Sequence, residues 1–327
     1  MEFMPNFRLH RPSQLTDAIA AKAEAESLYL AGGTDMLVNV RRGIVQPKHH
    51  VDLSAVAELK RRRADADGLT LGSGLTLAEI AADDVIAARY PAVAQAARAV
   101  AGPTHQAYGT LGGNLCLDTR CLFYNQSEWW RKSNDYCLKE RGDICHVAPG
   151  GKRCFAAFSG DVAPALIVYD AEVTLTGPDG TRRIPLEKLY RNDGMAHLTL
   201  KPGEILAAVH LPATHAGDPS SYEKARIRGS IDFPLAGVAV RLKLAADGTV
   251  ADLAVALTAV NPYPHRSTGT DAYKGKRLDT ALLDALRDQV RKQAKPMRTT
   301  TVAPWYRRRV VGAIARRLTA ELAGFTE

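Results

Sequence analysis

All five cysteines of this 327-residue chain lie between Cys116 and Cys154. Four of them fall in residues 120–158, a segment with little hydrophobic periodicity. A structureless loop of this length is uncommon inside a compact domain unless something holds it together. A packed set of thiolates can do so by binding an iron–sulfur cluster or a zinc ion. The sequence therefore predicts an insertion that is organised by a metal centre.

The overall composition is that of an ordinary globular protein, with 46% hydrophobic and 24% charged residues. No run of about 18 apolar residues is present, so we expect no membrane-spanning helix. The amino-terminal residues lack the apolar core of a signal peptide, which favours a cytoplasmic location. Disulfides are disfavoured in that compartment, so the cysteines are expected to serve metal binding or redox chemistry.

The chain is basic, with a formal net charge of +8. Its basic runs, at Lys60–Arg63, Arg307–Arg309 and Arg316–Arg317, are scattered, and they form no aromatic-interleaved patch or RNA-binding motif. We therefore expect no nucleic-acid partner. The favoured interpretation is a solvated basic surface that steers an acidic protein partner.

The first part of the chain alternates short apolar strands with Ala-rich helical segments, which predicts a small parallel βαβ unit over residues 1–53. Its strands are expected at Phe7–Leu9, Ser27–Leu30 and His49–Leu53, and its helices at Ser13–Glu26 and up to about Arg42. Residues 54–215 are expected to form a second part with a mixed sheet. Its signals are a strand at Thr70–Gly74, a capping box at Thr76–Glu79, a helix at Pro91–Val100 and a hairpin from Ala171–Thr176 to Thr181–Ile184.

The last part of the chain, residues 216–327, is expected to form a domain of antiparallel strands closed by helices. The strands are expected at Tyr222–Arg228, Gly237–Leu244 and Val250–Val260, and the helices at Thr280–Lys295 and Pro304–Ala323. The predicted fold class is therefore α+β. It has a two-part domain over 1–215, a cysteine-bearing insertion at 120–158 within it, and a carboxy-terminal domain over 216–327.

Two glycine-rich loops are candidates for phosphate binding. In Leu30-Ala-Gly-Gly-Thr-Asp35, between a strand and a helix, the glycines let the backbone pass close to a diphosphate. This loop is neither a Gly-x-Gly-x-x-Gly nor a P-loop motif, so a tight structural turn remains an equal alternative. Gly109-Thr-Leu-Gly-Gly-Asn-Leu115 is a second loop of the same kind, with Thr110 and Asn114 as side-chain donors. Together the two loops favour an extended dinucleotide.

These two loops resemble the paired FAD-binding loops in the flavoprotein subunit of the molybdenum hydroxylases, the xanthine oxidase and carbon monoxide dehydrogenase group. The resemblance covers nearly the whole chain, and removing residues 120–158 gives a sequence similar to the uninterrupted segment of most family members. The resemblance implies that FAD binds to Ala31, Gly32, Gly33, Thr34, Asp35, Thr110, Gly112, Gly113, Asn114, Asp161, Leu206 and Lys224.

The cysteine-bearing insertion departs from the ordinary family pattern. It resembles the β subunit of 4-hydroxybenzoyl-CoA reductase, which adds a 4Fe-4S cluster. We expect the ligands to be Cys121, Cys137, Cys145 and Cys154, with Cys116 packing beside the flavin loop. The spacing Cys-x15-Cys-x7-Cys-x8-Cys matches neither a ferredoxin nor a zinc ribbon, so from spacing alone a cluster, a zinc ion and unliganded thiols all remain open.

Three further residues of the insertion are candidates for roles near the cysteines. His146 adjoins Cys145 and is either a zinc ligand or, as we favour, a solvated loop residue. Trp129 and Trp130 are expected to shield the cluster from water, with anchoring of a partner subunit as the second interpretation.

The resemblance implies an electron-transfer flavoprotein subunit with no catalytic residue of its own. Its partners would be a large molybdopterin-containing subunit and a small 2Fe-2S subunit. Electrons would pass from reduced ferredoxin through the 4Fe-4S cluster and FAD to the 2Fe-2S and molybdenum centres, for dehydroxylation of 4-hydroxybenzoyl-CoA to benzoyl-CoA. One alternative is the FAD subunit of another molybdenum hydroxylase acting on a different aromatic or heterocycle. A different class is a basic zinc-binding module that contacts nucleic acid.

Overall fold

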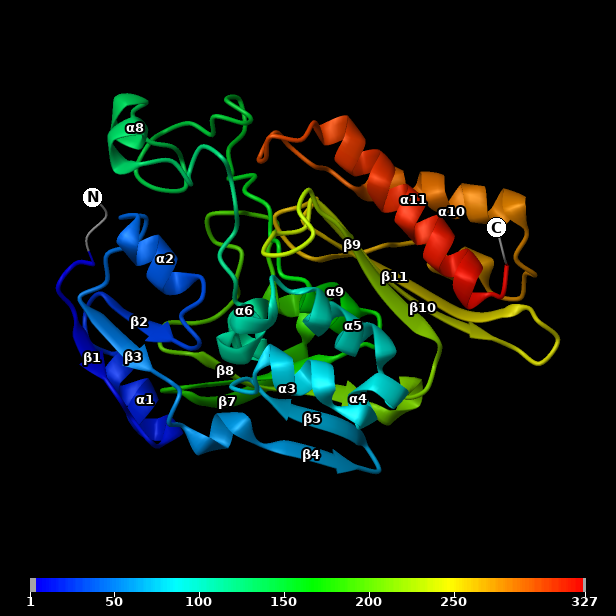
Figure 1. Ribbon diagram of the computed structural model, residues 1–327, viewed down its shortest axis with the longest axis horizontal. Helices are drawn as coiled ribbons and strands as arrows, with labels where there is room; N and C mark the ends of the chain where they lie inside the picture. Colours follow the sequence, from blue (N-terminus) through cyan, green and yellow to red (C-terminus); the bar gives the residue numbers. More distant parts are fainter. Residues whose placement is uncertain (1–3, 326–327) are drawn as a thin grey trace.

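The computed structural model describes residues 4–325 and contains three β-sheets with helices packed on them (Figure 1). The predicted α+β class is confirmed. Within residues 4–325, no helix is both long enough and apolar enough to cross a lipid bilayer.

The predicted βαβ unit is confirmed. Its strands are β1 (Arg8–His10), β2 (Ser27–Leu30) and β3 (His49–Asp52), and its helices are α1 (Leu15–Lys22) and α2 (Met36–Arg41). The strands lie in the order β1-β3-β2, and both neighbouring pairs are parallel. A small core that includes Ala18, Val51 and Leu59 fills the space beside this sheet. The first glycine-rich loop leaves the carboxyl end of β2 and leads into α2.

A five-stranded sheet follows, in the order β4-β5-β8-β6-β7. Its strands are β4 (Arg62–Asp65), β5 (Gly68–Gly72), β6 (Glu172–Gly177), β7 (Gly180–Pro185) and β8 (Ile205–Pro212). All four pairs are antiparallel, so the expectation of a mixed sheet is corrected in this detail. The predicted hairpin is present as β6 and β7.

Six helices accompany this sheet, and all of them except α6, which has no buried residue, contribute to the largest hydrophobic core. They are α3 (Leu77–Ala82), α4 (Asp84–Arg89), α5 (Pro91–Ala99), α6 (Pro103–Tyr108), α7 (Leu111–Leu115) and α9 (Val162–Ile167). The capping box at the start of α3 is confirmed, because Glu79 N donates to Thr76 Oγ1 and the Glu79 carboxylate accepts from Thr76 N. The second glycine-rich segment is only partly a loop, since α7 begins within it.

The carboxy-terminal part is an antiparallel sheet in the order β12-β11-β10-β9, covered by two long helices. Its elements are β9 (Ser220–Ala225), β10 (Ala236–Leu244), β11 (Val250–Thr258), β12 (His265–Arg266), α10 (Thr280–Gln293) and α11 (Pro304–Leu322). An apolar stripe of α11 packs onto the sheet, with Ile314 and Leu318 buried. Short 3-10 turns lie at Ala57–Lys60, Leu186–Leu189, Ala213–His215 and Thr270–Tyr273.

Residues 120–158 form a lobe of their own at the top of Figure 1, with α8 (Glu128–Ser133) as its helix. The lobe begins and ends at one place, because Arg120 and Ala157 exchange two backbone hydrogen bonds of 2.7 and 2.8 Å. Its core contains Cys121, Tyr124 and Cys154 and packs against Ile44, just after α2.

Candidate functional site

The two glycine-rich loops, which begin at Leu30 and Gly109, lie against each other. The backbone of Gly32 is pressed against Tyr108, so a β-carbon at position 32 would collide with the Tyr108 carbonyl oxygen. Gly33 has a φ of +72°, in the left-handed region that favours glycine. A β-carbon at Gly113 would lie 3.9 Å from the Ala31 side chain. These contacts build one continuous backbone surface from both loops, as a dinucleotide site requires.

The polar side chains of the second loop are engaged within the protein. Thr110 is the N-cap of α7, and its hydroxyl accepts a hydrogen bond of 3.1 Å from Gly113 N. Asn114 is buried, and its side-chain oxygen accepts from Val162 N at 3.0 Å. Thr110 and Asn114 therefore fix the shape of the loop and join it to α9. Gly113 is exposed at the surface of the loop.

Asp161 and Lys224 form a buried ion pair of 3.2 Å near the second loop. Tyr222 donates its hydroxyl to Asp161 Oδ1 at 2.7 Å, and Lys224 Nζ also donates to the Asp232 carbonyl at 3.1 Å. Burial raises the pKa of Asp161, although Lys224 and Tyr222 oppose the shift. Burial also lowers the pKa of Lys224. The two residues predicted to contact FAD are thus placed together.

Leu206 lies elsewhere than its predicted role suggests. Its side chain is buried within β8 and belongs to the main hydrophobic core, together with Leu111 and Leu115 of α7. The structure therefore places Leu206 beneath the second loop rather than on its open surface.

The carboxylate of Asp35, at the N-cap of α2, forms an ion pair with Arg120 at the start of the insertion. Burial lowers the pKa of Arg120 to about 10, and among the described residues its Nε has no hydrogen-bond partner. Arg120 was not predicted as a site residue. The sequence feature that could have identified it is its position immediately before Cys121.

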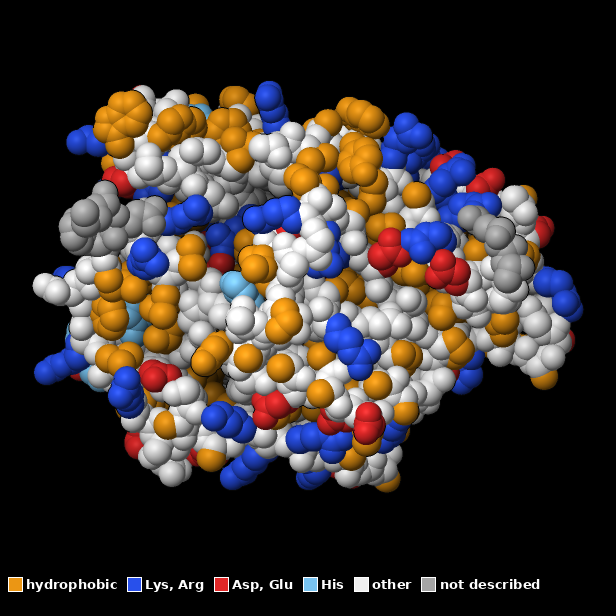
Figure 2. Space-filling view, viewed as in Figure 1, with side chains coloured by type: hydrophobic (Ala, Val, Ile, Leu, Met, Phe, Trp, Pro, Cys, Tyr) orange, Lys and Arg blue, Asp and Glu red, His pale blue; other side chains and the backbone are white. Residues whose placement is uncertain are grey.

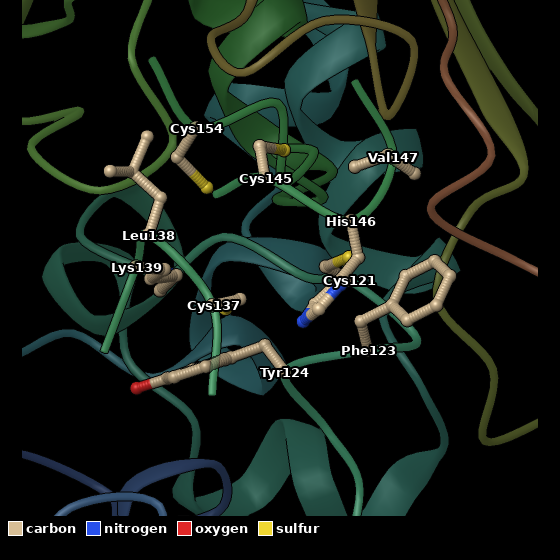
Figure 3. A pocket seen from close by; sticks show the side chains of 10 residues that line it. All are labelled: Cys121, Phe123, Tyr124, Cys137, Leu138, Lys139, Cys145, His146, Val147 and Cys154. Atoms are coloured by element: carbon tan, nitrogen blue, oxygen red, sulfur yellow. The ribbon is translucent and has the colours of Figure 1, made fainter. Parts of the chain in front are cut away.

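The four predicted cluster cysteines line one cavity in the insertion (Figure 3). The cavity has about 270 Å3 of unfilled space, part of it open to solvent, and its lining residues are Cys121, Phe123, Tyr124, Cys137, Leu138, Lys139, Cys145, His146, Val147 and Cys154. All five cysteines of the chain, each within the described part, are free thiols. Cys116 does not line this cavity and packs instead against the main core.

The apolar surroundings favour the neutral form of three of the cavity thiols. Burial raises the pKa of Cys121 and of Cys137, and it raises the pKa of Cys154 to about 12. Metal ligation requires the thiolates, so a metal centre in this cavity would form with release of protons. In residues 4–325, no three His, Cys, Asp or Glu side chains are gathered closely enough to hold a single ion. A cubane cluster needs wider spacing, because each thiolate binds a different iron.

Lys139 is a buried cation beside the cysteines. Its Nζ donates to Asp118 Oδ1 at 2.7 Å and to the Gly194 carbonyl at 3.1 Å, and it lies 4.8 Å from the centre of the Tyr124 ring. A positive charge in this position stabilises thiolates, and Lys139 opposes the rise in the pKa of Cys154. Sequence reasoning missed Lys139, although it stands two residues after Cys137.

The two tryptophans of the insertion lie in different environments. Trp129 is 76% exposed and does not shield the cavity, so that expectation was wrong for Trp129. Trp130 packs on Phe123 with ring centres 6.1 Å apart, and Phe123 in turn packs on His146 at 5.5 Å. His146 Nε2 is hydrogen-bonded to the Tyr136 carbonyl at 2.5 Å. Figure 2 shows apolar side chains along the upper edge, over α8 and the beginning of α11.

The donor sets at both places fit the groups predicted for them. The paired loops offer unbranched glycine backbone, two threonine hydroxyls and a nearby buried lysine, which suit a dinucleotide diphosphate. The insertion offers four free thiols around one cavity beside a cation, which suits a cluster. Fold and site together fit a class of proteins that bind an extended dinucleotide.

Comparison with known proteins agrees with this class. Residues 5–214 match the FAD binding domain in molybdopterin dehydrogenase, and residues 220–322 match the CO dehydrogenase flavoprotein C-terminal domain. The chain therefore belongs to the family of FAD-binding subunits of molybdenum hydroxylases.

Two relatives and one solved structure illustrate the similarity. The aldehyde oxidoreductase FAD-binding subunit PaoB of Escherichia coli (strain K12) is 30% identical over 259 residues, which cover 75% of this chain and 79% of PaoB. The xanthine dehydrogenase FAD-binding subunit of Escherichia coli O157:H7 is 25% identical over 318 residues, 95% of this chain and 94% of the relative. The fold is shared with carbon monoxide dehydrogenase from Hydrogenophaga pseudoflava, with a TM-score of 0.81, 23% identity and coverage of 99% and 100% of the two chains.

Proposed function

We propose that this chain is the electron-transfer flavin subunit of a molybdenum enzyme, and that its insertion adds a 4Fe-4S cluster to the FAD. One observation carries the proposal. Cys121, Cys137, Cys145 and Cys154 converge on one cavity, in a chain that matches the flavin-subunit family over residues 5–214 and 220–322. When bound, FAD and the cluster supply two-electron and one-electron transfer. The chain itself binds, orients and shields them.

The proposed roles in FAD binding follow from the placement of each residue. The backbone of both loops approaches the diphosphate, with the hydroxyl of Thr34 as a donor. Lys224 and Asp161 meet the remainder of the cofactor from β9 and the start of α9. The complete proposed set is Ala31, Gly32, Gly33, Thr34, Asp35, Thr110, Gly112, Gly113, Asn114, Asp161, Leu206 and Lys224. Within it, Asp35, Asn114 and Leu206 act by shaping the loops.

For the insertion we propose that the four cysteines are the cluster ligands. Lys139 offsets part of the negative charge of their thiolates. Phe123 and Tyr124 limit the access of water to the cavity they line. The division of the chain into 1–215, with its insertion, and 216–327 is part of the same proposal, as is a cytoplasmic location.

The specific enzyme we propose is 4-hydroxybenzoyl-CoA reductase, because the cysteine insertion resembles that of its β subunit. Its partners would be a large molybdopterin-containing subunit and a small 2Fe-2S subunit, with reduced ferredoxin as the donor. The second candidate is a flavin subunit of another molybdenum hydroxylase that acts on a different aromatic or heterocycle. Similarity to FAD-binding subunits named for xanthine and aldehyde substrates favours this second candidate. The matches to flavin-subunit families do not support a nucleic-acid-binding zinc module.

Two measurements on the purified protein test the proposal. Analysis of iron, zinc and flavin should find FAD and about four irons per chain. One zinc and no flavin would contradict it. The co-purified complex should then convert 4-hydroxybenzoyl-CoA to benzoyl-CoA with reduced ferredoxin, at a rate that falls with salt if basic residues guide docking. An intact flavin and cluster without this activity would favour the second candidate.

A further inference from the structure

Arg120 stands at the neck of the cysteine insertion. It immediately precedes Cys121, and its backbone exchanges hydrogen bonds of 2.7 and 2.8 Å with Ala157. The position of its α-carbon is therefore fixed by the pairing that closes the insertion. Its side chain is only 13% exposed and reaches Asp35, at the end of the first glycine-rich loop.

The guanidinium joins a three-residue polar cluster at the exit of that loop. It pairs with the carboxylate of Asp35 and donates from Nη1 to Asn39 Oδ1 at 3.3 Å. Asn39 Nδ2 donates back to Asp35 Oδ2 at 3.1 Å. Asp35 directly follows Gly32, Gly33 and Thr34. The three-residue polar cluster therefore fixes the end of the segment that faces the cofactor.

Arg120 also contacts a third segment. Its guanidinium lies 4.7 Å from the centre of the Phe233 ring, which is the geometry of a cation–π interaction. The neighbouring Asp232 carbonyl accepts a hydrogen bond from Lys224. One side chain thus connects the cysteine insertion, the first glycine-rich loop and the segment that supports Lys224.

We propose that Arg120 is the positioning residue through which the folded insertion holds the first flavin loop in its binding conformation. This inference rests on the proposed function, in which the paired loops bind FAD. Glycines leave the loop conformationally free, and a partly buried charged contact at its end removes that freedom before the cofactor arrives. A lysine would not substitute, because it lacks the planar group that both pairs with a carboxylate and stacks on a ring.

The test compares Arg120→Gln and Arg120→Lys with Lys132→Gln in the full chain. Lys132 lies in α8 of the same insertion and is exposed, so its variant controls for loss of one positive charge. FAD affinity is measured by fluorescence titration of the flavin-depleted protein, alongside iron content and the visible spectrum of the cluster. We expect Arg120→Gln to weaken FAD binding about tenfold or more, with iron content and Lys132→Gln unchanged. Arg120→Lys should retain folding and recover only part of the affinity.

A double-mutant cycle with Asp35→Asn separates positioning from general damage. If the two side chains act as one unit, Arg120→Gln and Asp35→Asn will weaken FAD binding non-additively. Additive losses, an affinity of Arg120→Gln within twofold of the wild type, or parallel loss of iron and FAD would each overturn the inference. Absence of FAD binding by the wild-type chain would instead overturn the proposed function.

Discussion

Apolar surroundings penalise the thiolate form of Cys121, Cys137 and Cys154, so burial raises the pKa of each of these three thiols. Four iron ions would compensate for that penalty by binding the thiolates directly. Cys116 has the same burial effect, which raises its pKa to about 12, but it lies outside the cavity. The difference between these thiols is therefore one of position, and it allows a matched comparison.

Cys137→Ser is expected to remove the visible absorbance and iron of the cluster while FAD stays bound. Serine is a poor substitute for a thiolate ligand, whereas the paired loops do not include residue 137. Iron analysis, the visible spectrum and flavin content measure the two cofactors separately. Cys116→Ser is the control and should keep both. Loss of FAD together with the cluster from Cys137→Ser would contradict separate sites.

Glu204 gives a prediction about pH. Its carboxylate accepts bonds of 2.7 and 2.8 Å from Arg182 and one of 2.7 Å from Lys201 N, and the contact with Arg182 is the main cause of its lowered pKa. The pKa of Glu204 in the folded protein is below the ordinary glutamate value of 4.5, so the stabilisation is present above pH 4.5 and is lost as the pH falls through the folded value.

Arg182→Gln tests this pH dependence. Because Arg182 is 32% exposed, the substitution should lower the free energy of unfolding by only about 1 kcal/mol at pH 7. Urea denaturation should show the difference from wild type shrinking as the pH is lowered below 4.5. A difference that stays constant with pH would exclude Glu204 as its source.

Secondary structure elements were predictable where the local signal was strong. The βαβ strands, the capped helix α3, the hairpin β6–β7 and the long helices α10 and α11 all carry periodic or capping patterns. Strand β4 was missed because its residues, Arg-Arg-Ala-Asp, are exposed and do not alternate. Helix α7 was predicted to be part of a loop, because glycines disfavour helix formation.

The paired loops and the cysteine insertion were predictable from the sequence, but the residues that connect them were not. Motif resemblance identified the two loops, and the cysteines identified the insertion. Contacts between distant segments, such as Gly32 with Tyr108 or Arg120 with Asp35, leave no periodic signal in one sequence. The contacts of Lys139 and Arg120 are therefore evident only in the folded structure.

The paired neck of the insertion allows a prediction about the element as a whole. Replacing residues 121–156 with Asn-Gly would connect Arg120 to Ala157 by a two-residue turn, which suits a pair that exchanges both backbone hydrogen bonds. The shortened chain should fold and bind FAD but contain no iron. Circular dichroism and cofactor analysis measure both. A chain that fails to fold would show that the insertion is required by the rest of the protein.

Across the whole molecule, a buried arginine connects the two main parts. Arg241 of β10 is fully buried and donates to the Val168 carbonyl after α9, to Asp218 at 2.9 Å and to Asp252 of β11 at 2.7 Å. These partners come from both the flavin-binding part and the carboxy-terminal sheet. The contacts of Arg241 therefore couple the stability of the flavin-binding part to that of the carboxy-terminal sheet.

Arg241→Gln is expected to lower the free energy of unfolding by about 3–5 kcal/mol, because it leaves buried Asp218 without its main cation. Lys243→Gln is the control in the same strand. Lys243 is 53% exposed and lies 3.6 Å from Asp218, so its loss should cost no more than about 0.5 kcal/mol. Urea denaturation measures both variants. Equal effects would show that burial of Arg241 does not govern the stability of this junction.

The isolated β-bridge between Arg120 and Ala157 has a consequence for protein engineering. A segment that leaves and rejoins its host at one pair of residues imposes little change on the host backbone. Residues 121–156 can therefore be transplanted between the corresponding positions of a flavin subunit that lacks them. Such a chimera would show whether a redox centre is portable between members of one fold.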